Sequence, residues 1–526
     1  GLMFIIGSAL LLISTMNSKE TRRGFYPLIV ILIFSFSGLL QAETTLQFFL
    51  SWEIMTVSAF LLILRGKFSA PHALRYIMFS TLGSYFILAA FGFAFRETSN
   101  VLMESFAMIY TSAPTILIFL SLGFLIKSGA MGLHLWLPGS YAEAEDDFSP
   151  FVSSILSKAG IFGFLVFLGI FGKNFLGDTS FTVILGWIGV LTAFFGALMA
   201  IFQEDIKYLL AYSSMSQIGY IVLAVASLSH LGWVAAIYLS VNHFLFKAIL
   251  FITIAGVISR VKTRNMYEMG GLIKKMPLSF VATLISIIAI SGVPPLTGFG
   301  GKWLMYNALF EKSWYLQAGL AFFSGAISFL YLFRLIHTIF LGQVKTAHRK
   351  IKEASAFYIV PSFLLVIVIM AFSTYPNLLI KPIIAGVSSY FPTNLSWEKL
   401  TLIGPYGYWN GHRVMLVTMG VFMIPLIWIS LRIRSIRKVK QFNIVYAAER
   451  PERPETTHYA YNFFAPYQKA LGFLVKPRAT KIWNSVVEWI FSLSASLRHI
   501  YTGNGQTYGL QIIMYIVIVY FASGLK

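Results

Sequence analysis

The sequence predicts an all-α polytopic membrane protein, and three observations lead to this prediction. Hydrophobic residues make up 57% of the 526 residues, whereas charged residues make up only 11%. A typical soluble domain carries roughly 25% charged residues, so this chain has too few charges to cover itself with a soluble surface. Apolar stretches also recur along the chain at about the 20-residue length that a helix needs to cross a bilayer. These observations exclude a disordered chain and an ordinary globular enzyme.

About fourteen apolar stretches are candidate membrane-spanning helices. They cover residues 1–14 (in part), 26–43, 45–64, 70–95, 113–137, 150–172, 181–202, 206–228, 231–257, 278–310, 316–341, 356–375, 414–431 and 509–523. The first stretch is too short for a full span. Because Gly1 is not an initiator residue, we expect a truncated or processed N-terminal helix within residues 1–25.

The formal charge of +20 is best explained by membrane topology rather than by nucleic-acid binding, because loops on the cytoplasmic side carry an excess of Lys and Arg. One set of alternate loops holds most of the basic residues: Lys19, Arg22, Arg23, Arg65, Lys67, Arg260, Lys262, Arg264, Lys274, Lys275, Lys345, Arg349, Lys350, Lys352, Arg432, Arg434, Arg437, Lys438 and Lys440. The opposite set holds mainly Arg96, Lys173, Lys312, Lys381, Lys399 and Arg413. We therefore expect the first set to be cytoplasmic.

The chain contains no Cys, which excludes disulfides, thiolate-held zinc and Cys-ligated iron–sulfur clusters. Its 9 His show no metal-ligand spacing. No phosphate-binding loop, dinucleotide-binding fingerprint, nucleophile elbow or haem site is recognisable. We expect this chain to bind no cofactor and no metal.

Ionisable residues inside the spans are the candidates for function. A charge at the bilayer centre costs about 2.5–3.5 kcal/mol on insertion scales, so such residues are functional candidates by default. The candidates for ion translocation are Glu53, Lys127, Lys158, His243, Lys247 and Lys302. His243 and Lys247 are four residues apart and share one helix face. Burial disfavours the charged form of an ionisable group, so a series of buried lysines could pass protons, and a glutamate–lysine pair could act as a switch. The alternative for any one of these residues is a paired structural role.

Other ionisable residues give weaker signals. His134 and Lys207 lie near helix ends, where a structural role is somewhat more expected. Arg334 and His337 could extend the series of buried ionisable residues, or they could place their polar ends at the membrane surface. Four acids, Glu143, Glu145, Asp146 and Asp147, lie in a loop expected to be cytoplasmic. We expect a solvated loop or a subunit contact there, with cation attraction as the alternative.

Two spans are predicted to be broken. Pro294-Pro295 removes backbone donors in one of them, and Ser128-Gly129 with Gly132 weaken the other. Irregular backbone at membrane depth is tolerated only inside protein or beside water, and broken helices near ionisable residues indicate an ion path. Residues 26–172 and 181–341 each contain five spans with the fourth broken, which predicts two inverted repeats with one half-channel each.

The C-terminal part divides into three further segments. Residues 356–445 are accessory helices, 446–508 are an amphipathic segment, and 509–526 are a last span. The amphipathic segment is polar at first and then places Trp483, Trp489, Phe491 and Leu497 among Lys and Arg. It is predicted either to lie in the membrane interface or to brace neighbouring subunits laterally.

Several strings over residues 26–341 resemble one family: the antiporter-like subunits of respiratory complex I, of Mrp-type sodium/proton antiporters and of group 4 membrane-bound [NiFe]-hydrogenases, including formate hydrogenlyase. The strings are Ser51-Trp52-Glu53, Lys127 with His134-Leu135-Trp136-Leu137-Pro138, Leu156-Ser157-Lys158-Ala159-Gly160-Ile161-Phe162-Gly163, Gln203-Glu204-Asp205-Ile206-Lys207-Tyr208-Leu209-Leu210-Ala211-Tyr212-Ser213-Ser214, His243-Phe244-Leu245-Phe246-Lys247-Ala248 and Gly292-Val293-Pro294-Pro295-Leu296-Thr297-Gly298-Phe299. The tail Leu497–Gly505 is similar to the hydrogenase-type branch. The loop after Pro138 is more acidic than in many members.

The resemblance implies roles for the candidate residues. Glu53 is similar to the buried glutamate of the family, Lys127 to its broken-helix partner, Lys158, His243 and Lys247 to the central relay, and Lys302 to the lysine of the second broken helix. It implies a proton-translocating subunit of a complex I-like respiratory assembly, hydrogenase-linked or of the NADH-quinone type, with sodium as an alternative coupling ion.

The resemblance also implies a place and partners for the chain. The place is a prokaryotic cytoplasmic membrane or an equivalent energy-transducing membrane. The partners are other membrane subunits and peripheral redox subunits, which would hold iron–sulfur clusters and a [NiFe] centre, or flavin and quinone. The alternative functions are an Mrp-type cation/proton antiporter subunit and an inert membrane scaffold.

Overall fold

The computed structural model describes residues 2–17, 22–176, 180–342, 344–432, 458, 461–476, 478–498 and 504–522. They form two compact units, Gly1–Gly472 and Phe473–Lys526, which are described separately. Lys19, four of the basic residues between 434 and 440, and most of the polar start of segment 446–508 lie outside the described residues.

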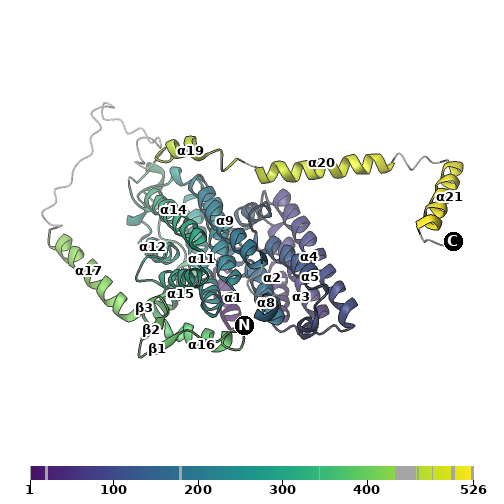
Figure 1. Cartoon of the computed structure of the whole chain (residues 1–526). Helices are drawn as coiled ribbons and strands as arrows, with labels where there is room; N and C mark the ends of the chain where they lie inside the picture. The colour runs from purple at the N-terminus through teal and green to yellow at the C-terminus, as the bar shows by residue number, and fades with distance from the viewer. Residues whose placement is uncertain are drawn as a thin grey trace. The chain divides into compact units, whose positions relative to one another are not determined.

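The first unit is a bundle of apolar helices (Figure 1). Its first half contains α1 (Leu2–Thr15), α2 (Phe25–Leu40), α3 (Thr45–Ile63), α4 (Ala70–Thr98), α5 (Ala113–Ser128), α6 (Leu137–Glu143), α7 (Ser149–Phe151), the π-turn η2 (Val152–Leu156) and α8 (Lys158–Leu176). Its second half contains α9 (Ser180–Ile201), α10 (Ile206–Ala226), α11 (His230–Val261), α12 (Pro277–Ser291), α13 (Thr297–Glu311), α14 (Tyr315–Phe340), α15 (Ala356–Thr374), α16 (Asn377–Val387) and α17 (Gly411–Arg432). Short 3₁₀ turns lie at Met103–Met108, Met266–Glu268, Leu272–Lys274 and Thr346–His348.

Eight helices in the described ranges are long and apolar enough to cross a membrane. Seven further apolar helices of 10 to 17 residues accompany them. Helix α11 lies in the middle of the bundle, because almost all of its side chains are buried, whereas α3 and α4 each leave one face exposed. The prediction of a predominantly helical membrane protein is confirmed.

Both predicted breaks occur, and each divides a predicted span into two helices. Helix α5 ends at Gly129, which has φ +70°, and Gly132 also has positive φ before α6 begins. Helix α12 ends at Gly292, which has φ +72°, and Pro294 and Pro295 separate it from α13. Glycine adopts this left-handed conformation without the steric cost that other residues incur. Helices α5 and α6, and likewise α12 and α13, are therefore pairs around a non-helical segment, and the first pair extends beyond the predicted stretch 113–137 to Glu143.

A small antiparallel sheet, which the hydrophobic pattern does not predict, lies between α16 and α17. It contains β1 (Ser396–Glu398), β2 (Thr401–Gly404) and β3 (Gly407–Trp409). The buried Trp409 ring packs against Phe299 and Trp303 of α13. A Cβ atom at Gly300 would lie only 2.1 Å from this ring. The sheet is therefore fixed directly to the second half of the broken helix.

The second unit contains two helices, α20 (Arg478–Arg498) and α21 (Gly505–Ala522). Helix α20 is amphipathic, with Ile482, Trp489 and Phe491 exposed beside basic residues. It accounts for the apolar part of the predicted amphipathic segment, and α21 corresponds to the predicted last span.

Replacement of Gly292 by alanine is expected to destabilise the protein. The position has positive φ, and an added Cβ would meet the Lys302 side chain at 2.5 Å. We expect a loss of about 1–3 kcal/mol in the free energy of unfolding, measured as a lower thermal midpoint in detergent. The control is Gly319→Ala in α14, where an added Cβ meets nothing within 4 Å. Equal midpoints for both variants would contradict the strain at Gly292.

Candidate functional site

Lys127 lies in the last turn of α5, directly before the first break. It is 1% exposed. Its Nζ donates to Thr56 Oγ1 on α3 and to the Tyr76 hydroxyl on α4, both at 2.9 Å. A cation at a helix C-terminus is favoured by the helix dipole. We call Lys127, Thr56 and Tyr76 the Lys127 cluster.

Glu53 lies on α3, one turn before Thr56. Its side chain is partly exposed, but Oε1 is covered and has no hydrogen-bond partner. Glu53 and Lys127 interact electrostatically, although no ion pair within 4.0 Å joins them among the described residues. The predicted glutamate–lysine pair is thus two separated charges.

Lys158 begins α8 directly after the π-turn, a feature that is frequent at functional sites. Its Nζ donates to Ser153 O at 2.9 Å and to Ser157 Oγ at 3.2 Å, and lies 2.5 Å from His243 Nδ1 on α11. We call Lys158, Ser153, Ser157 and His243 the Lys158 cluster. An apolar pocket of about 210 Å³ borders Lys158.

Lys247 lies one turn after His243 on α11 and is fully buried. Its Nζ donates to Leu210 O at 2.8 Å and to the Ser213 hydroxyl, both on α10. Lys247 and Lys158 interact electrostatically. The shared helix face thus places His243 and Lys247 in one buried region, where they interact electrostatically but form no hydrogen bond with one another.

Lys302 lies on α13, after the second break. Its Nζ donates to Ser291 O at 2.8 Å, and Ser291 is the last residue of α12. The last carbonyls of a helix have no partner inside the helix, so the lysine satisfies an acceptor that the break leaves open. The Tyr220 ring lies 5.1 Å from the ammonium group.

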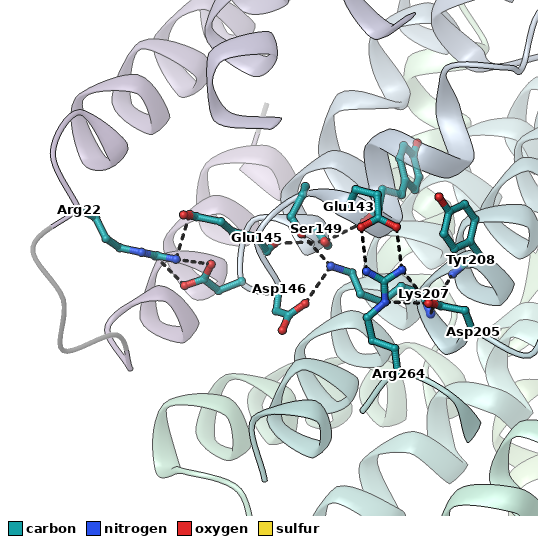
Figure 2. Close-up of polar contacts among 12 residues, drawn as sticks. Arg22, Glu143, Glu145, Asp146, Ser149, Asp205, Lys207, Tyr208 and Arg264 are labelled. Carbon is teal, nitrogen blue, oxygen red and sulfur yellow. Dashed lines mark hydrogen bonds and ion pairs between the residues drawn. The ribbon is translucent and has the colours of Figure 1, made fainter. Parts of the chain in front are cut away.

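The acidic loop that follows α6 forms an intramolecular ion-pair network rather than a solvated patch (Figure 2). Arg22, before α2, binds both Asp147 oxygens at 2.7 and 2.8 Å and Glu145 at 3.0 Å. Arg65, after α3, lies 3.5 Å from Glu145. This part of the network connects the start of α2 and the end of α3 to the loop.

Arg264 holds the other side of the network, between α11 and α12 (Figure 2). Its guanidinium forms two parallel bonds to Glu143 at 2.9 Å and one to Asp205 at 2.7 Å. Glu143 is the last residue of α6, and Asp205 caps α10 through the amides of Lys207 and Tyr208. Bidentate arginine–carboxylate pairs of this kind are strong and geometrically specific.

Lys207 completes the network and is only 2% exposed. Its Nζ donates to Ala144 O at 2.8 Å and to Asp146 Oδ1 at 2.9 Å. Lys207 therefore fastens α10 to the loop after the first broken helix.

The network changes the acid strength of its members. Burial alone would raise the pKa of Glu143, but the Arg264 guanidinium outweighs it and lowers that pKa below its ordinary value. Burial raises the pKa of Glu145, even though Arg22 and Arg65 act in the opposite direction. The network thus stabilises Glu143 in its ionised form.

The remaining sequence candidates lie apart from the buried lysines. His134 lies in the non-helical segment between α5 and α6, is 3% exposed, and its Nδ1 accepts from Gly132 N at 3.3 Å. Arg334 of α14 donates to Gln203 O at 2.5 Å, and His337 lies one turn further along that helix against Phe333. In the described residues, no group of three or more His, Asp or Glu is placed to hold a metal ion.

The sequence reasoning missed the hydroxyl partners of the buried lysines and the role of the acidic loop. Tyr76 and Thr56 lie one and two helices before the helix of Lys127, in an apolar context that offers no local signal. The acidic loop did carry a signal in the sequence. Its four acids could have been matched with basic residues near helix ends that are expected on the same side of the membrane, namely Arg22, Arg65, Lys207 and Arg264.

Fold and site together define a polytopic membrane protein with a buried series of ionisable side chains. Residues 42–328 match the membrane-spanning family described as NADH:quinone oxidoreductase/Mrp antiporter. Because this match covers more than half of the chain, the chain belongs to that family, an antiporter-like membrane-subunit family of energy-transducing membranes.

Individual relatives agree with this assignment. NADH-quinone oxidoreductase subunit N of Desulforudis audaxviator is 27% identical over 333 residues, which are 62% of this chain and 66% of that protein. Hydrogenase-4 component B of Escherichia coli is 30% identical over 300 residues, which are 54% of this chain and 44% of that protein. The match thus spans less than two thirds of the length of either relative.

One solved structure resembles nearly the whole chain. It is a chain of the membrane-bound sulfane sulfur reductase, an archaeal respiratory membrane complex, with a TM-score of 0.86 and 26% identity. The alignment covers 98% of this chain and 87% of that chain. The likeness therefore includes regions on both sides of the family match.

Glu143→Gln is expected to destabilise the protein at pH 7 by about 1–2 kcal/mol, because it leaves the Arg264 charge without its bidentate partner. A lowered folded-state pKa contributes stability above the ordinary value of 4.5, and this contribution is lost as the pH falls through the folded pKa. The difference in thermal midpoint between wild type and variant should therefore shrink below about pH 4.5. Glu104→Gln, at an exposed carboxylate, is the control. A difference that is independent of pH would contradict the ion-pair explanation.

Proposed function

We propose that this chain is a proton-translocating subunit of a complex I-like membrane respiratory complex. The observation that supports this function best is the series of buried cationic side chains with neutral partners. Among the described residues, Lys127, Lys158, Lys247 and Lys302 have no carboxylate within 4.0 Å. Purely structural lysines in a low-dielectric bundle would be expected to be paired with acids.

The partners of these lysines suit proton exchange. Hydroxyl groups donate and accept, and a histidine nitrogen can hold or release a proton. In the Lys158 cluster, ammonium, hydroxyl and imidazole nitrogen are in direct contact. A proton can therefore pass between Lys158 and His243 without a large movement of either helix. Lys247 continues the series on the next turn of α11.

Glu53 is proposed to control the proton affinity of Lys127. The two groups interact electrostatically but are held apart, and Lys127 binds Thr56 and Tyr76 instead. A charge or conformational change in a neighbouring subunit that alters the distance between Glu53 and Lys127 would alter how tightly Lys127 holds its proton. This is the switch step of the proposed mechanism.

The bundle is proposed to contain two inverted repeats, residues 26–172 and 181–341, with about fourteen spans in the whole chain. The support is the matching order of elements: α2, α3, α4, the α5–α6 pair and α8, then α9, α10, α11, the α12–α13 pair and α14. In each series the fourth member is broken and carries a buried lysine beside the break. Each repeat would supply one half-channel, and residues 1–25, 356–445, 446–508 and 509–526 would be accessory segments.

The hydrogenase-type branch is favoured over the NADH-quinone type. The support is the 30% identity over 300 residues to hydrogenase-4 component B. Redox centres, namely iron–sulfur clusters and a [NiFe] centre or flavin and quinone, would then lie in partner subunits. Helix α20 would brace neighbouring membrane subunits or lie in the membrane interface.

Glu53→Gln and Lys127→Met are each expected to lower proton translocation at least about tenfold. Vesicles carrying the assembled complex are energised with a potassium gradient and valinomycin, and internal pH is followed with pyranine at two sodium concentrations. Lys274→Met, at an exposed lysine outside the spans, should translocate like wild type. Unchanged proton flux in the two variants would favour the inert scaffold. Flux that depends on sodium would favour the antiporter alternative.

Gentle-detergent purification of the tagged chain, followed by mass spectrometry, tests the branch. Iron–sulfur subunits and a large hydrogenase-like subunit are expected to co-purify. Recovery of the chain with membrane subunits alone, from membranes that contain the redox subunits, would contradict the hydrogenase-type assignment.

A further inference from the structure

In the described part of the chain, no hydrogen bond joins the Lys127 cluster to the Lys158 cluster, although protons must pass between them if both act in one path. One further buried hydroxyl lies near members of both clusters. It belongs to Tyr141, on the short helix α6 that follows the first break. The Tyr141 and Tyr76 rings both pack against Trp136, with centroid distances of 6.3 and 5.2 Å, and the Tyr141 phenol interacts with Tyr76 and with the Ser157 hydroxyl.

The Tyr141 side chain is 0% exposed. Its ring packs against Trp136 and Phe251, with centroid distances of 6.3 and 6.5 Å. Its hydroxyl, however, forms no direct hydrogen bond with the protein. A buried hydroxyl without a partner is costly, and buried polar groups are normally satisfied. Phenylalanine would provide the same ring contacts without this cost, so packing alone does not account for the hydroxyl.

We propose that the Tyr141 hydroxyl carries protons between the Lys127 cluster and the Lys158 cluster. This inference rests on the proposed function. A proton from Lys127 Nζ passes to the Tyr76 oxygen as the Tyr76 proton moves on to Tyr141. Tyr141 in turn releases its own proton towards Ser157, which passes its proton to a neutral Lys158. Each hydroxyl oxygen gains one proton and loses one, so neither tyrosine has to ionise, and rotation about the C–O bonds restores the starting state.

The ion-pair network gives this carrier its fixed position. Helix α6 has only seven residues, and the network holds its C-terminal end. Arg264 binds Glu143, Lys207 binds Ala144 O, and the Ser149 hydroxyl donates to Tyr141 O itself at 2.8 Å. The residues of the acidic loop therefore act as positioning residues for the Tyr141 hydroxyl.

Tyr141→Phe separates a proton carrier from a packing residue, because it removes only the hydroxyl. Flux is measured in vesicles of the assembled complex, as for the Lys127 variant, over a range of pH. We expect at least a tenfold loss of flux in Tyr141→Phe, with normal assembly. Tyr141→His should recover part of the flux, with a new pH dependence near the ordinary histidine pKa of about 6.5. A packing role predicts the opposite order, with the phenylalanine variant the more active.

Tyr238→Phe is the matched control, because Tyr238 is also fully buried and its hydroxyl also lacks a hydrogen-bond partner. It should translocate like wild type. Ser157→Ala provides a second test that does not depend on the Tyr141 site. Because both hydroxyls lie in one series, Tyr141→Phe combined with Ser157→Ala should lose little more flux than the more impaired single variant.

The failure of this inference differs from the failure of the proposed function. Wild-type flux and an unchanged pH profile in Tyr141→Phe would overturn the Tyr141 carrier alone. Losses that multiply in the double variant would also overturn it, because they would indicate separate paths. A wild-type complex that moves no protons would overturn the proposed function and, with it, this inference.

Discussion

The rest of the structure depends on how the bundle satisfies its buried ammonium groups. The hydrocarbon core of a bilayer contains no water to solvate an ammonium group. Each buried lysine therefore needs hydrogen-bond acceptors from the protein at membrane depth. The acceptors are neutral: the last carbonyl of α12 for Lys302, a carbonyl of the π-turn for Lys158, and hydroxyls of neighbouring helices for Lys127. Helix irregularities and buried lysines are therefore complementary, because an open carbonyl and a free ammonium satisfy each other.

The acids of the loop after α6, unlike the buried lysines, have charged partners. The carboxylates of the loop after α6 meet arginines and a lysine at one end of the bundle, where pairs are partly solvated. Paired charges at this end fix the geometry, whereas the lysines inside remain without paired acids. This separation explains how one chain can combine a rigid frame with groups that are able to change protonation state.

The membrane class, the helix positions and both breaks could be predicted from the sequence, because a bilayer imposes a length and glycine and proline impose a backbone. Burial of Lys127, Lys158, Lys247 and Lys302 also followed from their position within apolar stretches. Their partners did not follow, because Thr56, Tyr76 and Ser213 are brought to the lysines by helix packing across long sequence distances. The roles of these residues in translocation remain predictions.

The same limit applies to the short elements. Residues 396–409 carry no strong alternation of apolar and polar residues, so the small sheet could not be predicted from periodicity. Likewise, the separation of Glu53 from Lys127 depends on side-chain directions that spacing along the chain does not specify.

Trp409 has a consequence for the mechanics of the second half of the bundle. Its ring occupies the space that any side chain at Gly300 would need, two residues before Lys302. The Tyr406 ring, in the turn before β3, also packs against Phe310 of the same helix. A displacement of β3 would therefore have to displace the α13 backbone beside a buried lysine as well.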